Sequence, residues 1–144
     1  MDEQTLFGKI IAGQIPSHKV ASGNDWYAFL DISPRRSGHT LVIPHKQVAN
    51  LHQLNDDQVA SLFIGVKEVQ NKLSKVFETN DFTICIHDGP LAGQEVPHVH
   101  IHVIPRTIGD GGRTLMAMWP DNISNAEPNH VELSALAEKL TGVE

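Results

Sequence analysis

The chain has a single cysteine, Cys85, among its 144 residues, which excludes an intrachain disulfide and a zinc site built from several thiolates. No stretch approaches the ~20 apolar residues of a membrane-spanning helix, and the first residues lack the basic and apolar regions of a signal peptide. Basic residues are also few. The formal net charge of −6 argues against charge-driven binding to nucleic acid or to an acidic membrane. We therefore expect a cytoplasmic protein without a nucleic-acid or membrane partner.

The chain is long enough for one domain with its own hydrophobic core. Apolar spacing and turn residues predict a helix at 6–11, strands at 26–31 and 40–43, a long amphipathic helix from 55 or 56 to 76, strands at 82–86 and 98–104, and a terminal helix at about 128–141. The short connections between strands favour an antiparallel meander over parallel crossovers. We expect one α+β domain over 1–144, with its core at about 5–106 and the long helix packed on the sheet.

Three histidines, His98, His100 and His102, alternate with apolar residues in one predicted strand. Side chains on a strand alternate between its two faces, so the three imidazoles share one face and the apolar residues share the other. A strand that served only the core would not need this row. Because the pKa of imidazole lies close to neutrality, the row indicates proton transfer, nucleophilic attack or metal binding.

A metal held by all three histidines conflicts with the geometry of a strand. At ~3.3 Å per residue the outer two histidines lie about 13 Å apart, whereas zinc–nitrogen bonds are only ~2.0–2.1 Å. Two adjacent histidines could share an ion, but no third ligand stands at an obvious spacing. Histidines that are simply buried or exposed remain the plain alternative. The loop at 87–96, with two glycines, favours phosphate, because exposed backbone N–H groups there can hold an anion.

The segment 93–105, GQEVPHVHIHVIP, resembles the signature of the histidine triad superfamily of nucleotide hydrolases and transferases. The segments 7–11, 15–16, 28–32 and 38–44 are similar to the same family in order and spacing. The resemblance therefore covers roughly residues 5–106. It implies the histidine triad fold, a homodimer whose sheet continues across the interface, and a reaction that needs no metal or other cofactor.

The resemblance also implies roles for individual residues. His100 would attack the α-phosphorus of a nucleotide and form a covalent nucleotidyl-histidine, which water would then release. His98 and His102 would contact phosphate oxygens and orient the nucleophile, with His102 a proton donor to the leaving group, and His39 would pack beside them. The positions implied to bind the nucleotide are Asp31 at the ribose, Gln94 and the Val96 N–H at the phosphate, His87 near it, and Leu6, Phe7, Ile10, Phe29, Leu30 and Ile32 around the base.

Several positions depart from the family pattern. Many bacterial members hold a structural zinc with two cysteines, but Thr5 and Gly8 stand at the cysteine positions here, and Val48 stands where a histidine is common. We therefore expect no zinc at this place. Glu95 replaces a serine or threonine next to the expected phosphate site, where a carboxylate would repel phosphate unless it turned outward.

Other features leave the substrate open. His87 replaces a glutamine of the fragile histidine triad branch, which hydrolyses dinucleoside polyphosphates, whereas the N-terminal half resembles the nucleotide-binding branch, which favours nucleoside phosphoramidates. Trp119 either anchors a loop or reaches the site of a partner subunit.

The sequence thus predicts a hydrolase acting on a purine nucleotide with a substituted α-phosphate. The alternatives are a nucleotidyltransferase of the same superfamily, a nucleotide-binding regulatory module, which Glu95 favours, and a metalloenzyme.

Overall fold

The computed structural model describes residues 3–121 and 127–143. The chain forms two compact units, Met1–Asp110 and Gly111–Glu144. The first contains, in chain order, α1 (Leu6–Ile11), β1 (Lys19–Gly23), β2 (Trp26–Leu30), β3 (Thr40–Pro44), η1 (Leu51–Gln53), α2 (Asp56–Phe77), β4 (Phe82–Cys85), η2 (Pro90–Ala92) and β5 (Ile101–Pro105), where η marks a single turn of 3-10 helix. The second contains η3 (Leu115–Met118) and α3 (His130–Thr141). No helix in the described ranges is long and apolar enough to cross a membrane.

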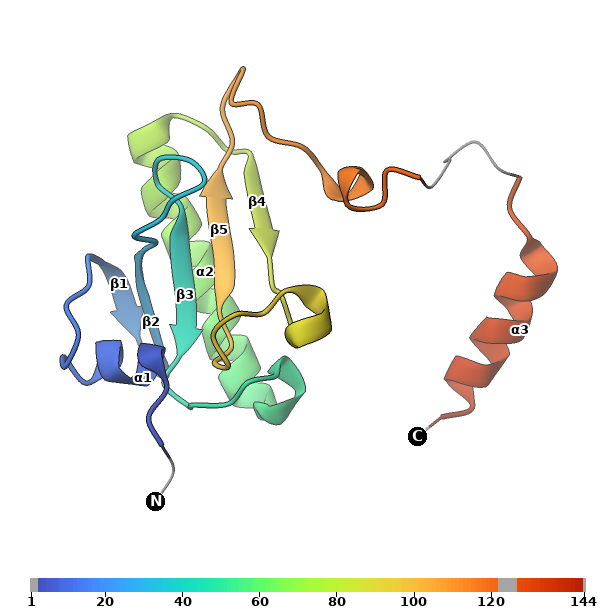
Figure 1. Cartoon of the computed structure of the whole chain (residues 1–144), viewed down its shortest axis with the longest axis horizontal. Coiled ribbons are helices and arrows are strands. Elements are labelled where there is room, and N and C mark those ends of the chain that lie inside the picture. The colour runs from blue at the N-terminus through green and yellow to red at the C-terminus, as the bar shows by residue number, and fades with distance from the viewer. Residues whose placement is uncertain (1–2, 122–126, 144) are drawn as a thin grey trace. The chain divides into compact units, whose positions relative to one another are not determined.

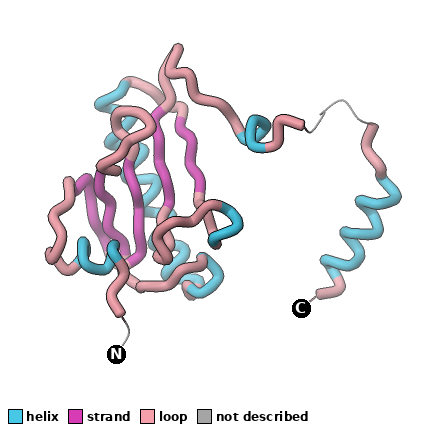
Figure 2. The backbone as a smooth tube through the Cα atoms, in the orientation of Figure 1, coloured by secondary structure: helices cyan, strands magenta, loops and turns pink. Residues whose placement is uncertain are grey.

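The five strands form one sheet in the order β1-β2-β3-β5-β4, and each neighbouring pair is antiparallel (Figures 1 and 2). Strands β1 to β3 follow one another as a meander. The chain then passes through α2, and β4 pairs along the outer edge of β5. The expected α+β fold with an antiparallel sheet and one long helix against it is confirmed.

The long helix α2 begins where the sequence places a capping box. The Asn55 side chain accepts a hydrogen bond from the Gln58 N–H, and the Gln58 side chain accepts one from the Asn55 N–H. Asp56 and Asp57 add negative charge at the positive end of the helix dipole. One face of α2 is apolar, so the helix packs against β1, β2, β3 and β5 behind the sheet (Figure 1).

Alternation along the strands divides the apolar residues between two clusters. Towards α2 lies the larger cluster, which includes Trp26, Ala28, Val42, Val99, Ile101 and Val103 from the sheet segments and Leu62, Val66, Val69 and Leu73 from the helix. The other face of the sheet carries Phe29, Leu41 and Ile43 with Phe7 of α1. Residues between the α2-facing positions of β5, such as His102, point to this second face. The apolar residues of the histidine row therefore fill the core, as predicted.

Two elements differ from the sequence expectations. The strand β1 was not predicted, because the segment KVASG is short, contains small and polar residues, and pairs on one side only, through an irregular register. The histidine strand was predicted from 98 but begins at Ile101. Before that point the backbone turns, since the His98 N–H bonds to Val96 O and the Val99 N–H bonds to Val48 O instead of to β3.

Candidate active site

A cavity of about 500 Å³ lies on the face of the sheet that carries Phe29, Leu41 and His102. Cavities that bind small molecules in proteins have volumes of about 300–1,000 Å³, so this one has room for a nucleotide. It is lined by the predicted site residues Leu6, Phe7, Ile10, Phe29, Leu30, Asp31, Ile32, His39, His87, Val96, His100 and His102. Of the predicted site residues, only His98 and Gln94 do not line it.

The middle histidine of the row, His100, has one ring nitrogen fixed by the backbone. Its Nδ1 lies 2.7 Å from the carbonyl oxygen of His98. A carbonyl oxygen can only accept a hydrogen bond, so Nδ1 carries the ring proton and Nε2 keeps its lone pair. The Phe7 ring meets the His100 ring edge to face, with centroids 5.0 Å apart, and restricts its rotation. His100 therefore presents an unprotonated nitrogen at the cavity, as a nucleophile requires.

The proton positions on His102 follow from its partners. The Arg35 backbone N–H donates to His39 Nδ1 over 3.1 Å, so neutral His39 carries its proton on Nε2. That nitrogen lies 2.9 Å from His102 Nδ1 and donates to it. His102 then carries its own proton on Nε2, a buried nitrogen with no hydrogen-bond partner among the described residues. The His102 ring, 5.1 Å from the His100 ring between centroids, thus offers a spare N–H donor.

Burial keeps these imidazoles neutral near pH 7. Loss of solvent is the largest cause that lowers the pKa of His39, His98 and His100 below its ordinary value. For His102, burial acts together with the nearby His100, His39 and His87 rings and lowers the pKa to about 4. Neutral rings are the state that attack by His100 and donation by His102 Nε2–H both need.

His98 is fully buried and lies outside the cavity lining. Its Nε2 lies 2.8 Å from the carbonyl oxygen of Pro44, and its Nδ1 lies 2.7 Å from the Thr5 hydroxyl. Both ring nitrogens are therefore engaged by the protein. This differs from the implied contact with phosphate oxygens, and the reason is that the backbone turns before Ile101 and carries the ring beneath the site. His98 acts on the site through its backbone carbonyl, which accepts the hydrogen bond from His100 Nδ1.

Gln94 also differs from its implied role at the phosphate. Its side-chain N–H donates to Ala49 O over 2.8 Å, and its Oε1 accepts from the Gly89 N–H over 2.8 Å. The amide thus ties the glycine loop to the segment before η1 and lies outside the cavity lining. Val96 does line the cavity, at the position implied for a phosphate contact.

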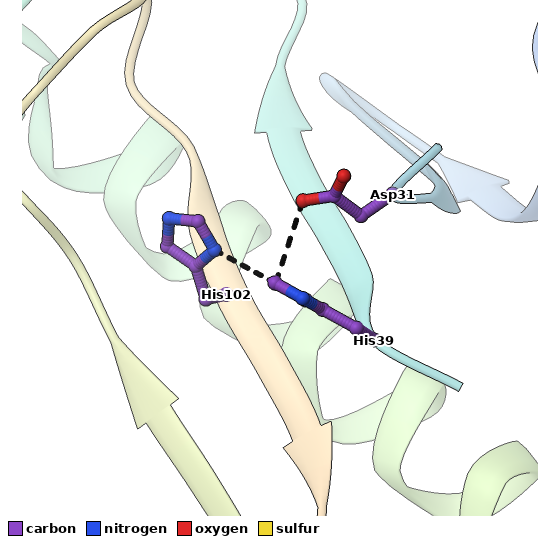
Figure 3. A group of neighbouring side chains, drawn as sticks. All are labelled: Asp31, His39 and His102. Atoms are coloured by element: carbon purple, nitrogen blue, oxygen red, sulfur yellow. Dashed lines mark hydrogen bonds and ion pairs between the residues drawn. The ribbon is translucent and has the colours of Figure 1, made fainter. Parts of the chain in front are cut away.

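Asp31 serves the turn and the cavity at once. One carboxylate oxygen accepts from the Ser33 N–H over 2.8 Å, which closes the turn after β2. The other, Oδ2, lies 3.6 Å from His39 Nε2 (Figure 3). Asp31, His39 and His102 each offer one ligand atom, and these atoms lie within 4.8 Å of one another. Among the described residues, these three, and not the three histidines of the row, have the spacing of metal ligands. That the reaction needs no metal stays a prediction.

Some cavity residues were not predicted. Ser17, Arg35 and Cys85 contribute to the lining, together with Ile15, Pro16, Ser33, Leu41, Gly93, Glu95 and Ile104. Cys85 reaches the site because it pairs with His102 in the β4–β5 register. Ser17 is held by a 2.7 Å hydrogen bond to the Tyr27 hydroxyl. Such placements depend on strand register, which spacing within one segment does not reveal.

The residues that depart from the family pattern have different surroundings in the fold. Gln47, and not Val48, faces Thr5 and Gly8: the Thr5 N–H donates to Gln47 Oε1 over 2.7 Å, whereas Val48 packs against the core. Glu95 is exposed and lines the cavity. The His87 ring lies against His102, with centroids 5.3 Å apart. Trp119 belongs to the second unit and is exposed.

Known proteins are similar to this chain over most of its length. The HIT domain family matches residues 12–108. Adenosine 5'-monophosphoramidase hnt1 of Schizosaccharomyces pombe is 35% identical over 136 residues, which are 94% of this chain and 95% of that protein. Bis(5'-nucleosyl)-tetraphosphatase [asymmetrical] of the same yeast is 45% identical over 110 residues, 76% of this chain and 59% of that protein.

Solved structures give the same result. The crystal structure of SMU.412c from Streptococcus mutans UA159 is 35% identical and superposes with a TM-score of 0.85, covering 98% of this chain and 85% of that one. The family match spans more than half of the chain and includes all five strands of the sheet. The chain belongs to the HIT domain family, whose relatives include nucleotide hydrolases.

Proposed function

We propose that the protein hydrolyses a purine nucleotide whose α-phosphate carries a second substituent, through a covalent intermediate on His100. The observation that carries this proposal is a pair of ring nitrogens. His100 Nε2 has a free lone pair at the cavity, and the adjacent His102 Nε2–H has no partner among the described residues. One nitrogen can attack phosphorus while the other donates to a phosphate oxygen, and no bond within the site has to break first.

The first displacement forms a bond between His100 Nε2 and the α-phosphorus as the bond from phosphorus to the leaving group breaks. The leaving group departs with that electron pair, and an amine leaving group takes up a proton from solvent. The ring becomes a cation, and its Nδ1–H bond to His98 O stabilises that charge. In the second displacement a water oxygen bonds to phosphorus, the P–N bond breaks, and its electron pair returns to Nε2. The water loses its proton to solvent, and a nucleoside monophosphate leaves.

The apolar part of the cavity supports a base and ribose beside this centre. Leu6, Phe7, Ile10, Phe29, Leu30 and Ile32 line it. Asp31 has Oδ2 available in the lining and can accept hydrogen bonds from ribose hydroxyls. Purines offer the larger flat surface for such a pocket, which is why we assign a purine nucleotide.

The relatives support two leaving groups. One is named a monophosphoramidase and matches almost the whole chain, and another is named a tetraphosphatase and is more identical over a shorter stretch. Both reactions attack a nucleotide phosphate that carries a substituent. A panel of adenosine phosphoramidates and dinucleoside tri- and tetraphosphates, compared by kcat/KM, distinguishes these two substrate classes.

The variant His100→Ala tests the nucleophile on the preferred substrate. We expect kcat to fall by at least about 10³-fold, because no other ring presents a free nitrogen in the same place. His52 is an exposed histidine outside the cavity lining, so His52→Ala is the matched control and should retain activity. In His102→Ala a nucleotidyl adduct should accumulate on His100 and be found by mass spectrometry after alkaline quenching. Activity that survives His100→Ala would contradict the proposal.

One observation favours a second candidate, a regulatory module that binds nucleotide with little turnover. Glu95 lies in the cavity lining, and its negative charge would oppose the charge that builds up on phosphate oxygens. Nucleotide affinity with negligible steady-state turnover on every substrate of the panel would favour this module over the hydrolase.

A further inference from the structure

The N-terminal end of α1 is tied to the histidine row by hydrogen bonds around one hydroxyl. Thr5 Oγ1 lies 2.7 Å from His98 Nδ1 and accepts from the Gly8 N–H over 2.8 Å. The Thr5 N–H donates to Gln47 Oε1 over 2.7 Å. Thr5, Gln47 and His98, which we call the Thr5 cluster, join three segments that are far apart in sequence.

The direction of the Thr5–His98 hydrogen bond follows from the other side of the ring. His98 Nε2 faces the carbonyl oxygen of Pro44 at 2.8 Å, so this nitrogen carries the proton. The buried ring is neutral, which leaves Nδ1 as an acceptor. The Thr5 hydroxyl therefore donates to Nδ1. Its longer contact, 3.2 Å to Gln47 Oε1, competes for the same proton and is the weaker of the two.

Two sets of contacts connect the Thr5 cluster to His100, the proposed nucleophile. The His98 carbonyl accepts from His100 Nδ1–H over 2.7 Å, so the position of His98 decides which His100 nitrogen is free. Phe7, two residues after Thr5 in α1, contacts the His98 and His100 rings edge to face, at 5.7 and 5.0 Å between centroids. A shift of Thr5 would therefore move both the His98 carbonyl and the Phe7 ring, which hold the His100 ring in place.

The cluster does not fit a zinc ion, although it stands where the family resemblance places one. Thr5 and Gln47 offer a neutral hydroxyl and a neutral amide oxygen, His98 offers one nitrogen, and Gly8 has no side chain. Zinc in proteins binds thiolates, imidazoles and carboxylates. A Cβ at residue 8 would lie only 2.0 Å from Gln47 Oε1, so the glutamine occupies the space of a side chain at that position.

We propose that Thr5 is a positioning residue for His100, and that the Thr5–His98 hydrogen bond holds the His98 ring and carbonyl where they fix the His100 tautomer. Gln47 holds Thr5 in turn. In this chain the cluster supplies by hydrogen bonding what a metal ion would otherwise supply by coordination. This inference rests on the proposed role of His100 as the nucleophile.

The variant Thr5→Val tests the inference, because it removes the hydroxyl and nearly keeps the shape. We expect kcat to fall about 10-fold or more with little change in KM, since a small misplacement slows chemistry more than it weakens binding. Thr5→Ser keeps the hydroxyl and should restore most of kcat. Thr114, exposed and with no side-chain cap hydrogen bond, provides the control Thr114→Val, which should behave as the parent protein.

Nitrogen-15 NMR of the histidine rings gives a readout that does not depend on turnover. In the parent and in Thr5→Ser we expect the His98 proton on Nε2 and the His100 proton on Nδ1, and in Thr5→Val a mixture of tautomers at His100. Unchanged ring signals and an unchanged kcat in Thr5→Val would overturn the positioning role while leaving the nucleophile intact. An active His100→Ala would instead overturn the proposed function.

Two further results keep the inference testable if Thr5→Val unfolds. Gln47→Leu leaves the hydroxyl in place and should lower kcat in the same direction by a smaller factor, whereas an unchanged kcat would remove Gln47 from the proposal. Metal analysis of the purified parent protein should find no stoichiometric zinc, and near-stoichiometric zinc would overturn the hydrogen-bonded cluster.

Discussion

At the scale of single residues, three chemically identical side chains have different roles because different backbone groups face them. Both ring nitrogens of His98 are hydrogen-bonded, one to Pro44 and one to Thr5. One ring nitrogen of His100 is bonded to a backbone carbonyl, and one of His102 is bonded to His39. The sequence predicted that the row shares a face and that His100 is its centre. It could not predict that His98 is buried below the site, because Pro44 and Thr5 come from distant segments.

The lowered pKa of His102 makes stability depend on pH. The ring has an ordinary pKa of 6.5 when unfolded and about 4 when folded, so the unfolded chain binds more protons between these values. The free energy of unfolding should therefore fall as pH drops from 6.5 towards 4, by on the order of 2 kcal/mol from this ring. Urea unfolding across this pH range measures the difference in the free energy of unfolding between the parent protein and His102→Gln. A difference that does not change with pH would contradict the assignment.

Glu95 should weaken nucleotide binding through the repulsion between its charge and the phosphate. The side chain is exposed and lines the cavity, so its charge acts through solvent and its effect is modest. We expect Glu95→Gln to lower KM about 2- to 5-fold at low ionic strength, to raise kcat by no more than the same factor, and added salt to reduce both effects. Glu68→Gln, an exposed site on α2 outside the cavity lining, is the control. A higher KM would show that Glu95 helps to bind the substrate.

At the scale of elements, hydrophobic periodicity predicted the parts that bury a continuous face. The helix α2 and the strands β2, β3 and β4 lie where their apolar spacing placed them. The edge strand β1 has little such spacing, and the start of β5 is decided by the Val99–Val48 hydrogen bond rather than by the alternation that runs through it. Local pattern thus determines which face is buried, and long-range pairing determines where a strand begins.

Gly65 tests how closely α2 approaches the sheet. A Cβ at this position would lie 2.5 Å from the Trp26 ring, which is buried in the core. Gly65→Ala should therefore destabilise the protein by about 1–3 kcal/mol through overpacking, although alanine favours a helix by ~1 kcal/mol. Asn71→Ala, at an exposed site of the same helix, should leave stability unchanged or raise it slightly. Thermal unfolding of both variants distinguishes contact from helix propensity, and a stabilised Gly65→Ala would contradict the packing.

At the scale of the whole molecule, the family resemblance predicted more than the residues alone. The HIT domain match confirms the fold, and the cavity contains most of the implied site. The residue-level reasoning had left proton transfer, attack and metal binding open. Hydrogen-bond partners within the folded chain, which no single segment contains, now favour attack by His100.

The homodimer remains a prediction, and the apolar face of α3 gives a physical reason to expect it. In the second unit, Leu133, Leu136 and Leu140 lie at helical spacing on α3 and form one apolar face. A helix of 12 residues is marginal in water by itself, so burial of this face in a dimer would stabilise it. We expect light scattering to give the mass of two chains at micromolar concentration, and Leu136→Glu to shift it towards one. A parent protein that is monomeric under these conditions would contradict the prediction.

The stereochemical course at the α-phosphorus tests the central claim most directly. A substrate whose α-phosphorus is made chiral with oxygen isotopes is hydrolysed, and the configuration of the product monophosphate is determined. Attack by His100 followed by attack of water comprises two in-line displacements, each of which inverts the configuration. Overall retention is the result we predict, and inversion would show that water attacks phosphorus directly and that no nucleotidyl-histidine forms.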